Sequence, residues 1–453
     1  MTTLSATGAL GHEPIHSASF FEGIKRRLDF IGADAGSGDS GPYFLGADQP
    51  MNPREWEEHD LELLFRAARE QSIPLIIGSA GGSGTNRGVD DYAAIIRDLA
   101  RRHGLGGFRL ARIYSEVPLE YLRERTRQEE LRALGAPSAL TLETLARTTR
   151  VVAMMGVEPY LAAFDRGADV VIAGRSCDDA IFAALPLRAG FPKGLAFHLG
   201  KTLECASLVA TPSMAKETVV GTITGEYVEL EPMHPAQRCT PQSVAGHSLY
   251  ERVHPYSQAY PGGVLETSAT SYEQVDDRRT RFRGSRFVAD PVYKLKLEGA
   301  ERVGSRAFTI GAIRDPIAIR ALDGVLEAVR AAVCEQFQRL RPDIDYRLLF
   351  HVYGRDGVMG PREPVRETRA HELCVVTEAV ADSREVAGLV ARFALYRLLF
   401  PTYHAQKATA GGIAMIADEV LYSEHDAYRW SVDHLLPEKD PLALFPITIE
   451  DVP

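Results

Sequence analysis

The chain has 453 residues, of which 45% are hydrophobic and 25% charged, a composition typical of a soluble globular protein with two or three domains. Its 51 basic and 61 acidic residues give a formal net charge of −10, and they form no basic stripe that could neutralise nucleic-acid phosphates. No apolar run of about 18 residues is present, so we expect neither nucleic acid nor a membrane as a partner.

The cysteines and the N-terminus indicate a cytoplasmic compartment. Met1–Pro14 lacks the basic segment and following apolar segment of a signal peptide. The five cysteines are odd in number and show no metal-type pairing, so we expect reduced thiols. The cysteines are Cys177, Cys205, Cys239, Cys334 and Cys374.

The first half of the chain alternates strand and helix patterns. Residues 1–16 look like a loose leader, and Leu28–Asp34 then predicts a strand that runs into a turn-rich loop, too polar to be buried. Asn52 and Pro53 predict a helix start, with Asn as N-cap. Because strands alternate with helices, we predict a mostly parallel sheet with helices on both faces. The further strands expected are Ile73–Ile77, Arg109–Tyr114, Val151–Met155 and Ala168–Ala173.

The second half of the chain shows a different residue pattern. Between residues 219 and 288 it contains stretches in which polar and apolar residues alternate, as in β-strands. Asp315 and Pro316 predict the start of a long helix. We therefore predict an α/β domain over residues 1–212 and an α+β domain over residues 213–453. The later elements expected are strands over Val292–Leu297, Ala307–Ile313, Tyr346–Tyr353 and Leu373–Ala379, and a helix over Arg384–Leu399.

The most informative stretch is the Gly-rich loop that follows the strand Ile73–Ile77. Glycines at the carboxyl end of a buried strand let a ligand approach the main chain, and the start of the next helix favours an anion. The residues expected to bind an anionic group are Gly81, Gly82, Ser83 and Asn86. The alternative is a tight turn between strand and helix that holds no ligand.

Arg175 and Asp178 follow the buried strand Ala168–Ala173 and should lie at the same sheet edge as the Gly-rich loop. Arginine can grip a carboxylate with two parallel hydrogen bonds, and Asp178 could orient that arginine or act as a general base. The alternative is that Asp178 or Asp179 caps the next helix with Arg175 as its ion-pair partner, which is the commoner use of Asp there.

The third candidate stretch runs from His198 to Cys205. At helical spacing, His198, Lys201, Glu204 and Cys205 could share one face. His198 could then be a general base, and Cys205 a nucleophile if Lys201 favours its thiolate. A surface helix with a buried cysteine would show the same pattern.

These stretches together resemble the acyclic terpene utilisation (AtuA-like) family. The resemblance extends over most of residues 29–303 and more loosely over the rest. It implies a role in the bacterial catabolism of branched acids that are handled as coenzyme A thioesters. The residues that carry it are Gly81-Gly82, Gly167-Ala-Asp-Val-Val-Ile-Ala-Gly-Arg175 with Asp178, and His198 with Glu204-Cys205.

We therefore predict a cytoplasmic catabolic enzyme, of lyase or hydratase type, that acts on a small carboxylate or acyl-CoA-linked substrate. Arg175 would clamp a carboxylate, and His198, Asp178 or Glu204 would move protons. One alternative is a non-catalytic binding or scaffolding subunit of a catabolic complex. Another is a thiol-dependent acyltransferase or hydrolase that uses Cys205.

The sequence identifies no cofactor and no metal-binding motif, since the dinucleotide, P-loop and zinc fingerprints are broken or absent. A coenzyme A thioester enters these predictions as a substrate, and the expected partner is a small anionic molecule. A homo-oligomer or a small partner subunit is compatible with the sequence.

Overall fold

The computed structural model describes residues 1–6, 8–135, 139–417 and 419–453. The chain divides into two compact units, one formed by Met1–Glu301 with Trp430–Pro453 and the other by Arg302–Arg429. The expected boundary near Thr211 falls inside the larger unit, because the strand β9 (Val219–Ile223) that follows it pairs with β1 (Thr2–Ser5). None of the described helices is both long enough and apolar enough to cross a bilayer.

The larger unit is built on a sheet whose centre is parallel and whose flanks are antiparallel. The order is β14-β15-β10-β9-β1-β2-β3-β7-β4-β22. The sheet is therefore mixed, and the prediction of a mostly parallel sheet is correct only for its five central strands. These are β1, β2 (Phe30–Asp34), β3 (Leu75–Gly78), β7 (Val170–Ala173) and β4 (Phe108–Ile113).

The loose leader that the sequence predicted contains one of these central strands. β1 lies between β9 and β2, and its residues Thr3, Leu4 and Ser5 are buried. Its four residues are too few to show a periodic pattern in the sequence, and only pairing with strands on both sides makes it part of the core.

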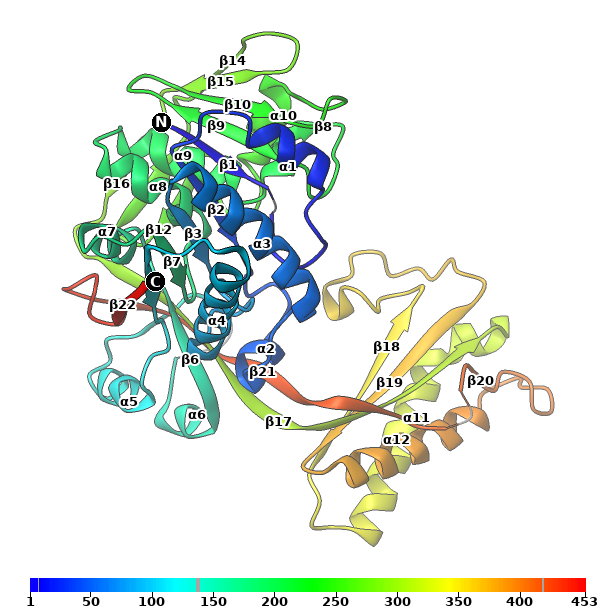
Figure 1. Cartoon of the computed structure of the whole chain (residues 1–453). Coiled ribbons are helices and arrows are strands. Elements are labelled where there is room, and N and C mark those ends of the chain that lie inside the picture. The colour runs from blue at the N-terminus through cyan, green and yellow to red at the C-terminus, as the bar shows by residue number, and fades with distance from the viewer. Residues whose placement is uncertain (7, 136–138, 418) are drawn as a thin grey trace. The chain divides into compact units, whose positions relative to one another are not determined.

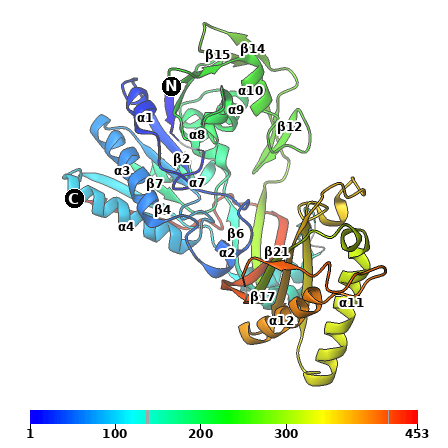
Figure 2. The same cartoon turned by 90° about the vertical axis from the view of Figure 1, so that its right-hand side faces the viewer.

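Successive side chains along the central strands point to opposite faces of the sheet, so apolar residues form a hydrophobic core on each face. In β3, Ile76 packs into one core, and Leu75 and Ile77 pack into the other. Helices α3 and α4 cover one face and α7, α8 and α9 the other (Figures 1 and 2). The helices of this unit are α1 (Ser17–Gly23), α2 (Tyr43–Ala47), α3 (Arg54–Gln71), α4 (Asn86–His103), α5 (Leu119–Arg127), α6 (Leu142–Arg147), α7 (Glu158–Asp165), α8 (Asp178–Arg188), α9 (Lys193–Leu203) and α10 (Pro241–His247).

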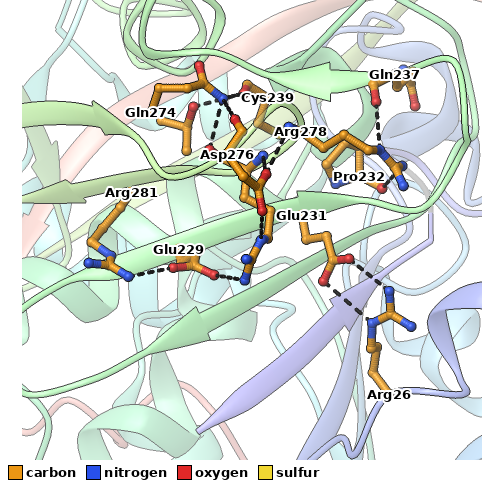
Figure 3. A network of polar contacts seen from close by, with 12 residues as sticks. Arg26, Glu229, Glu231, Pro232, Gln237, Cys239, Gln274, Asp276, Arg278 and Arg281 are labelled. Atoms are coloured by element: carbon orange, nitrogen blue, oxygen red, sulfur yellow. Dashed lines mark hydrogen bonds and ion pairs between the residues drawn. The ribbon is translucent and has the colours of Figure 1, made fainter.

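The antiparallel flank is tied together by surface ion pairs. Figure 3 shows Arg281 paired with Glu229, and Arg26 paired with Glu231, each at 2.8 Å. These side chains are partly exposed, and ion pairs near the surface typically contribute only about 0–1 kcal/mol each. The flanking strands are β9, β10 (Val228–Pro232), β15 (Thr280–Arg283) and β14 (Ser271–Gln274), with β22 (Ile447–Val452) at the other edge. The remaining strands of this unit are β5 (Arg132–Ala133), β6 (Thr148–Met154), β8 (Ala210–Thr211), β11 (Arg238–Cys239), β12 (Ser257–Tyr260), β13 (Gly263–Glu266) and β16 (Arg286–Ala289).

The smaller unit packs two helices against an antiparallel sheet. Asp315 caps α11 as predicted, because its carboxylate accepts hydrogen bonds from the backbone N–H groups of Ile317 and Ala318. The two strands expected over residues 292–313 form one continuous strand, β17. The elements are β17 (Lys294–Ile313) and β21 (Leu421–Pro437), which continue from the larger unit, with β18 (Tyr346–Tyr353), β19 (Leu373–Ala381), β20 (Ala414–Met415), α11 (Pro316–Leu340) and α12 (Arg384–Leu399).

The predicted N-cap at Asn52 is wrong by one residue. Pro53 is the N-cap of α3 and has no side-chain hydrogen bond to offer. The Asn52 side chain instead donates a hydrogen bond to the carbonyl oxygen of Leu10, at 2.9 Å. The local pattern predicts that the Asn52 side chain caps the helix, but in the structure it hydrogen-bonds to the distant residue Leu10.

Candidate active site

A cavity of about 180 Å³ lies at the carboxyl ends of the central strands in the larger unit. This position follows the general rule for open α/β sheets, in which ligands bind beyond the strands' carboxyl ends. Three of the predicted site residues, Asp178, Glu204 and Cys205, line the cavity. It is also lined by Asp34, which the sequence did not single out.

Asp34 is the last residue of β2 and is 4% exposed. Its Oδ2 accepts a hydrogen bond from the backbone N–H of Gly36 at 3.2 Å, while Oδ1 has no hydrogen-bond partner among the described residues. Burial raises the pKa of Asp34 well above its usual value, and the neighbouring charge of Asp178 adds to this effect. The charge of Arg175 and the Ser79 hydroxyl oppose this rise in the pKa of Asp34.

Asp178 is the first residue of α8, beside Arg175. Neither Asp178 nor Asp179 caps this helix, because the N-cap is Cys177 and it makes no side-chain bond. The predicted ion pair between Arg175 and Asp178 is correct, since Arg175 Nη1 lies 3.2 Å from Asp178 Oδ1. Burial raises the pKa of Asp178 to about 6, and the charge of Arg175 offsets part of the rise.

The main partner of Arg175 is Glu298 of β17. Arg175 Nε donates to Glu298 Oε2 at 2.8 Å, and Nη2 lies 3.5 Å from Oε1. Lys296 also pairs with Glu298, at 2.9 Å. Burial opposes ionisation of Glu298, yet the two cations bring its pKa down to about 2. The guanidinium fork that was expected to clamp a substrate carboxylate thus grips a carboxylate of the chain itself.

Arg175 faces a neighbouring cavity of about 210 Å³ together with Lys296 and Glu298. Asp39 lines both this cavity and the one that contains Asp34. The two cavities therefore meet the same loop, which follows β2.

Glu204 is brought to the cavity by close packing of α9 against the start of α8. Gly200 permits this approach, because a Cβ there would lie 2.3 Å from the carbonyl oxygen of Asp179. The fully buried ammonium of Lys201 pairs with Glu204 and lies 3.6 Å from Glu251. Burial and the charge of Asp179 raise the pKa of Glu204 well above its usual value, although Lys201 opposes the rise.

Behind Lys201, a second buried carboxyl group completes the cluster. Asp179 is 2% exposed and accepts a hydrogen bond from the hydroxyl of Tyr260. Burial raises the pKa of Asp179, and Lys201 and Tyr260 oppose this. The acidic groups of this cluster outnumber its cations, so they cannot all be ionised at low cost.

Cys205 lies in the wall of the cavity, with Sγ 3.8 Å from the carbonyl oxygen of Gly8. Burial raises the pKa of its thiol, and the carboxylate of Glu204 raises it further. Lys201 was expected to favour the thiolate, but it is paired with Glu204. The thiol is therefore held protonated, which is unfavourable for a nucleophile.

His198 does not lie in the cavity. It is fully buried, and its two ring nitrogens lie 2.6 Å from Ser285 Oγ and 2.8 Å from Ser248 Oγ. Its ring packs 4.0 Å from that of Phe282, and burial lowers its pKa to about 3. Because six residues of an α-helix span more than one and a half turns, His198 and Glu204 cannot share a face.

The Gly-rich loop is packed against the chain itself. Gly82 has φ of 93°, and a Cβ there would lie 2.4 Å from Cβ of Met51. Thr85 caps α4 by accepting from the N–H of Gly88, and Asn86 Oδ1 lies 3.3 Å from the backbone nitrogens of Ser115 and Glu116. Gly81 lines another cavity, of about 210 Å³, which shares no lining residue with that of Asp34.

The prediction that Arg175 lies at the same sheet edge as the Gly-rich loop is nevertheless correct. β3 pairs with β7 in parallel, and the N–H of Arg175 donates to the carbonyl oxygen of Gly84 at 3.2 Å. The structure brings Arg175, Asp178, Glu204 and Cys205 around the loop after β2, whereas His198, Gly81, Gly82, Ser83 and Asn86 do not line the Asp34 cavity. Asp34 could have been found by the signal used for Arg175, a polar residue at the end of an apolar strand.

Comparison with known proteins identifies the family of this chain. The family model of the acyclic terpene utilisation protein AtuA matches residues 4–419 of 453. Comparison with curated proteins and with solved structures yields no match. The family match covers most of both compact units, including β2, β7, α8 and α9, which carry or adjoin Asp34, Arg175, Asp178 and Lys201. The chain therefore belongs to the acyclic terpene utilisation family AtuA.

Proposed function

We propose that this protein is a catabolic enzyme of lyase or hydratase type, which moves protons on a small carboxylate or acyl-CoA-linked substrate. Family membership implies a role in acyclic terpene utilisation. The observation that carries the proposal is the cavity in which the carboxyl groups of Asp34, Asp178 and Glu204 meet.

The pKa values of these groups suit acid–base catalysis. Asp178, with a pKa of about 6, is mostly ionised at pH 7 and close to the value at which a general base is most effective. The pKa values of Asp34 and Glu204 are raised well above the usual range, which shifts both groups toward the form that can donate a proton. Two carboxyl groups whose environments drive their pKa values apart are typical of an acid–base pair.

These groups can carry out a reversible dehydration without any redox partner. Asp178 removes a proton from the carbon next to the substrate carbonyl, and the electron pair of that C–H bond forms a C=C bond. The C–O bond at the next carbon breaks, and the leaving oxygen keeps its electron pair. A protonated carboxyl group, Asp34 or Glu204, gives that oxygen a proton and water departs. Asp178 gains one proton and the acid loses one, and solvent restores both.

The two alternatives receive less support. A thiol-dependent acyltransferase needs a thiolate, and burial together with Glu204 raises the pKa of Cys205. A scaffolding subunit has no need for three carboxyl groups in one cavity, which cost folding free energy because they are desolvated.

The test is exchange of the substrate's α-hydrogen with solvent deuterium, followed by mass spectrometry. We expect the protein to exchange hydrogen at C2 of 3-hydroxybutanoyl-coenzyme A or of longer branched 3-hydroxyacyl thioesters. Asp178→Asn should lower the rate at least ~100-fold, the usual contribution of a general base. Cys205→Ala should retain the rate, and its loss would favour the thiol mechanism.

Glu57→Gln is the matched control. Glu57 is buried, accepts a hydrogen bond from Tyr92, and has a pKa raised by burial to about 7, but it lines a different cavity. Its substitution should leave exchange unchanged. A protein that exchanges no thioester or free acid in the panel would favour the scaffolding alternative.

A further inference from the structure

We propose that Asp34 is the general acid of this cavity, and that the reacting end of the substrate is uncharged. This inference rests on the proposed function and chooses between the two acids left open there. The group that Asp34 would protonate is a hydroxyl or a thioester oxygen, and not a carboxylate.

Hydrogen bonding separates Asp34 from the other carboxyl groups. Asp178 is held by Arg175, and Glu204 by Lys201. Of these three, Asp34 is the one with a fully buried oxygen, Oδ1, that has no hydrogen-bond partner among the described residues. A buried polar atom left without a partner costs about 1–3 kcal/mol in typical proteins, so its retention beside a cavity favours a ligand as partner.

The position of Asp34 suits a group that must be placed accurately. It ends β2, a central strand paired on both sides, by β1 and β3. Ala33 and Ala35, on either side of it, are fully buried. A catalytic group on a rigid strand end holds its geometry better than one on an exposed loop.

The charged groups around Asp34 leave no cation for a substrate carboxylate. Arg175, which faces Asp34 from the turn after β7, grips Glu298 and Asp178. Lys216 donates a hydrogen bond to the carbonyl oxygen of Ala9.

The other titratable groups of the cavity wall are acidic or neutral. Burial and the charge of Lys216 lower the pKa of His12, which keeps its ring neutral. The rest of the wall carries the acids Asp39 and Glu251 with the hydroxyl of Tyr250 and the thiol of Cys205. A carboxylate placed against Asp34 would therefore meet mainly like charge, whereas a hydroxyl or thioester group would not.

Esterification by diazoacetamide tests the assignment without requiring turnover. This small neutral reagent takes the proton of a carboxylic acid onto its diazo carbon, and the carboxylate then displaces N₂ to form an ester. Peptide mapping at pH 7 should find Asp34 labelled at least ~10-fold faster than Asp98, whose side chain is 50% exposed, and Asp34→Asn should lack this product. Labelling of Glu204 in place of Asp34 would overturn the assignment.

Two further measurements complete the test. Asp34→Asn should lower the formation of the unsaturated thioester from 3-hydroxybutanoyl-coenzyme A at least ~100-fold while its melting temperature stays near that of the wild type. Dehydration retained in this variant overturns the inference and leaves the proposed function intact, whereas a wild type that is labelled but neither exchanges nor dehydrates overturns both. 3-Hydroxybutanamide should slow the labelling of Asp34 and 3-hydroxybutanoate should not. Protection by the acid alone would overturn the uncharged substrate.

Discussion

The loops after β2 and β3 lie side by side and both contain several glycines, yet they differ in what they contact. The loop after β3 packs mainly against the chain itself, with Gly82 against Met51 and Gly84 against Arg175, and its Gly81 lines a separate cavity. The loop after β2 borders the cavity and is preceded by the buried carboxyl of Asp34.

Glycines in the two loops also allow the loops to pack closely against each other. A Cβ at Gly36 would lie 2.1 Å from the carbonyl oxygen of Gly82, so neither loop could approach the other with a larger residue there. Glycine at a strand end thus indicates close approach of the backbone to something. The backbone at such a glycine can approach either a ligand or another loop. Which of the two it approaches is decided by the loop that follows the adjacent strand in the sheet.

The largest effect is expected at Arg175, which contacts the loop after β3 and lines a cavity with residues of the loop after β2. Arg175→Met should lower the free energy of unfolding by about 3–5 kcal/mol, because it leaves the buried Glu298 without its main partner. The double variant with Glu298→Met should recover much of this loss. Urea unfolding of the single and double variants measures both. Equal stability of the two would mean that Glu298 is not the group that requires Arg175.

A matched pair of glycine substitutions separates the loops directly. Gly84 and Gly41 both have positive φ, 68° and 90°, but a Cβ at Gly84 would lie 2.2 Å from the nitrogen of Arg175, whereas one at Gly41 meets nothing within 4 Å. Gly84→Ala should cost roughly 2–5 kcal/mol, from strain and overpacking together. Gly41→Ala should cost only the strain, about 1–2 kcal/mol. Thermal and urea unfolding measure the stability that each variant loses. Similar losses for Gly84→Ala and Gly41→Ala would refute the proposed difference in packing between the two loops.

The cavity beside β2 should make stability depend on pH through Asp178. Its pKa is about 6 in the folded protein against 3.8 ordinarily, so the folded state binds more protons than the unfolded state between these values. Stability should therefore fall as pH rises from about 4 to 6, by up to about 3 kcal/mol. Relative to Asp178→Asn, the wild type should lose stability over this range in urea titrations. A relative gain would contradict the raised pKa.

The smallest effect is expected at Thr85, which caps α4 in the loop after β3. Thr85→Ala should lower the free energy of unfolding by about 1 kcal/mol, the usual cost of losing an N-cap hydrogen bond. It should leave the diazoacetamide labelling of Asp34 unchanged, because Thr85 does not line that cavity. Labelling that changed with this cap would show that the two loops are coupled.

Short-range signals in the sequence were enough for several parts of this protein. Apolar runs bounded by glycine predicted β3 and β7, and the Asp–Pro pair predicted the start of α11. The helix α12 has the predicted bounds Arg384–Leu399. Polar residues after β7 and α9 gave Asp178, Glu204 and Cys205, three of the residues that line the cavity. Periodicity and capping act over a few residues, so a sequence displays them directly.

Only the tertiary structure decided the partners of these groups. Arg175 meets Glu298, which lies 123 residues further along the chain, and β1 becomes a central strand because β9 pairs with it. Asp34 is buried because β2 lies between β1 and β3, and its Oδ1 finds no hydrogen-bond partner among the described residues. Gly82 faces Met51 because the loop after β3 packs against the segment before α3. Which strands pair is fixed by packing of the whole sheet, and no local pattern specifies it.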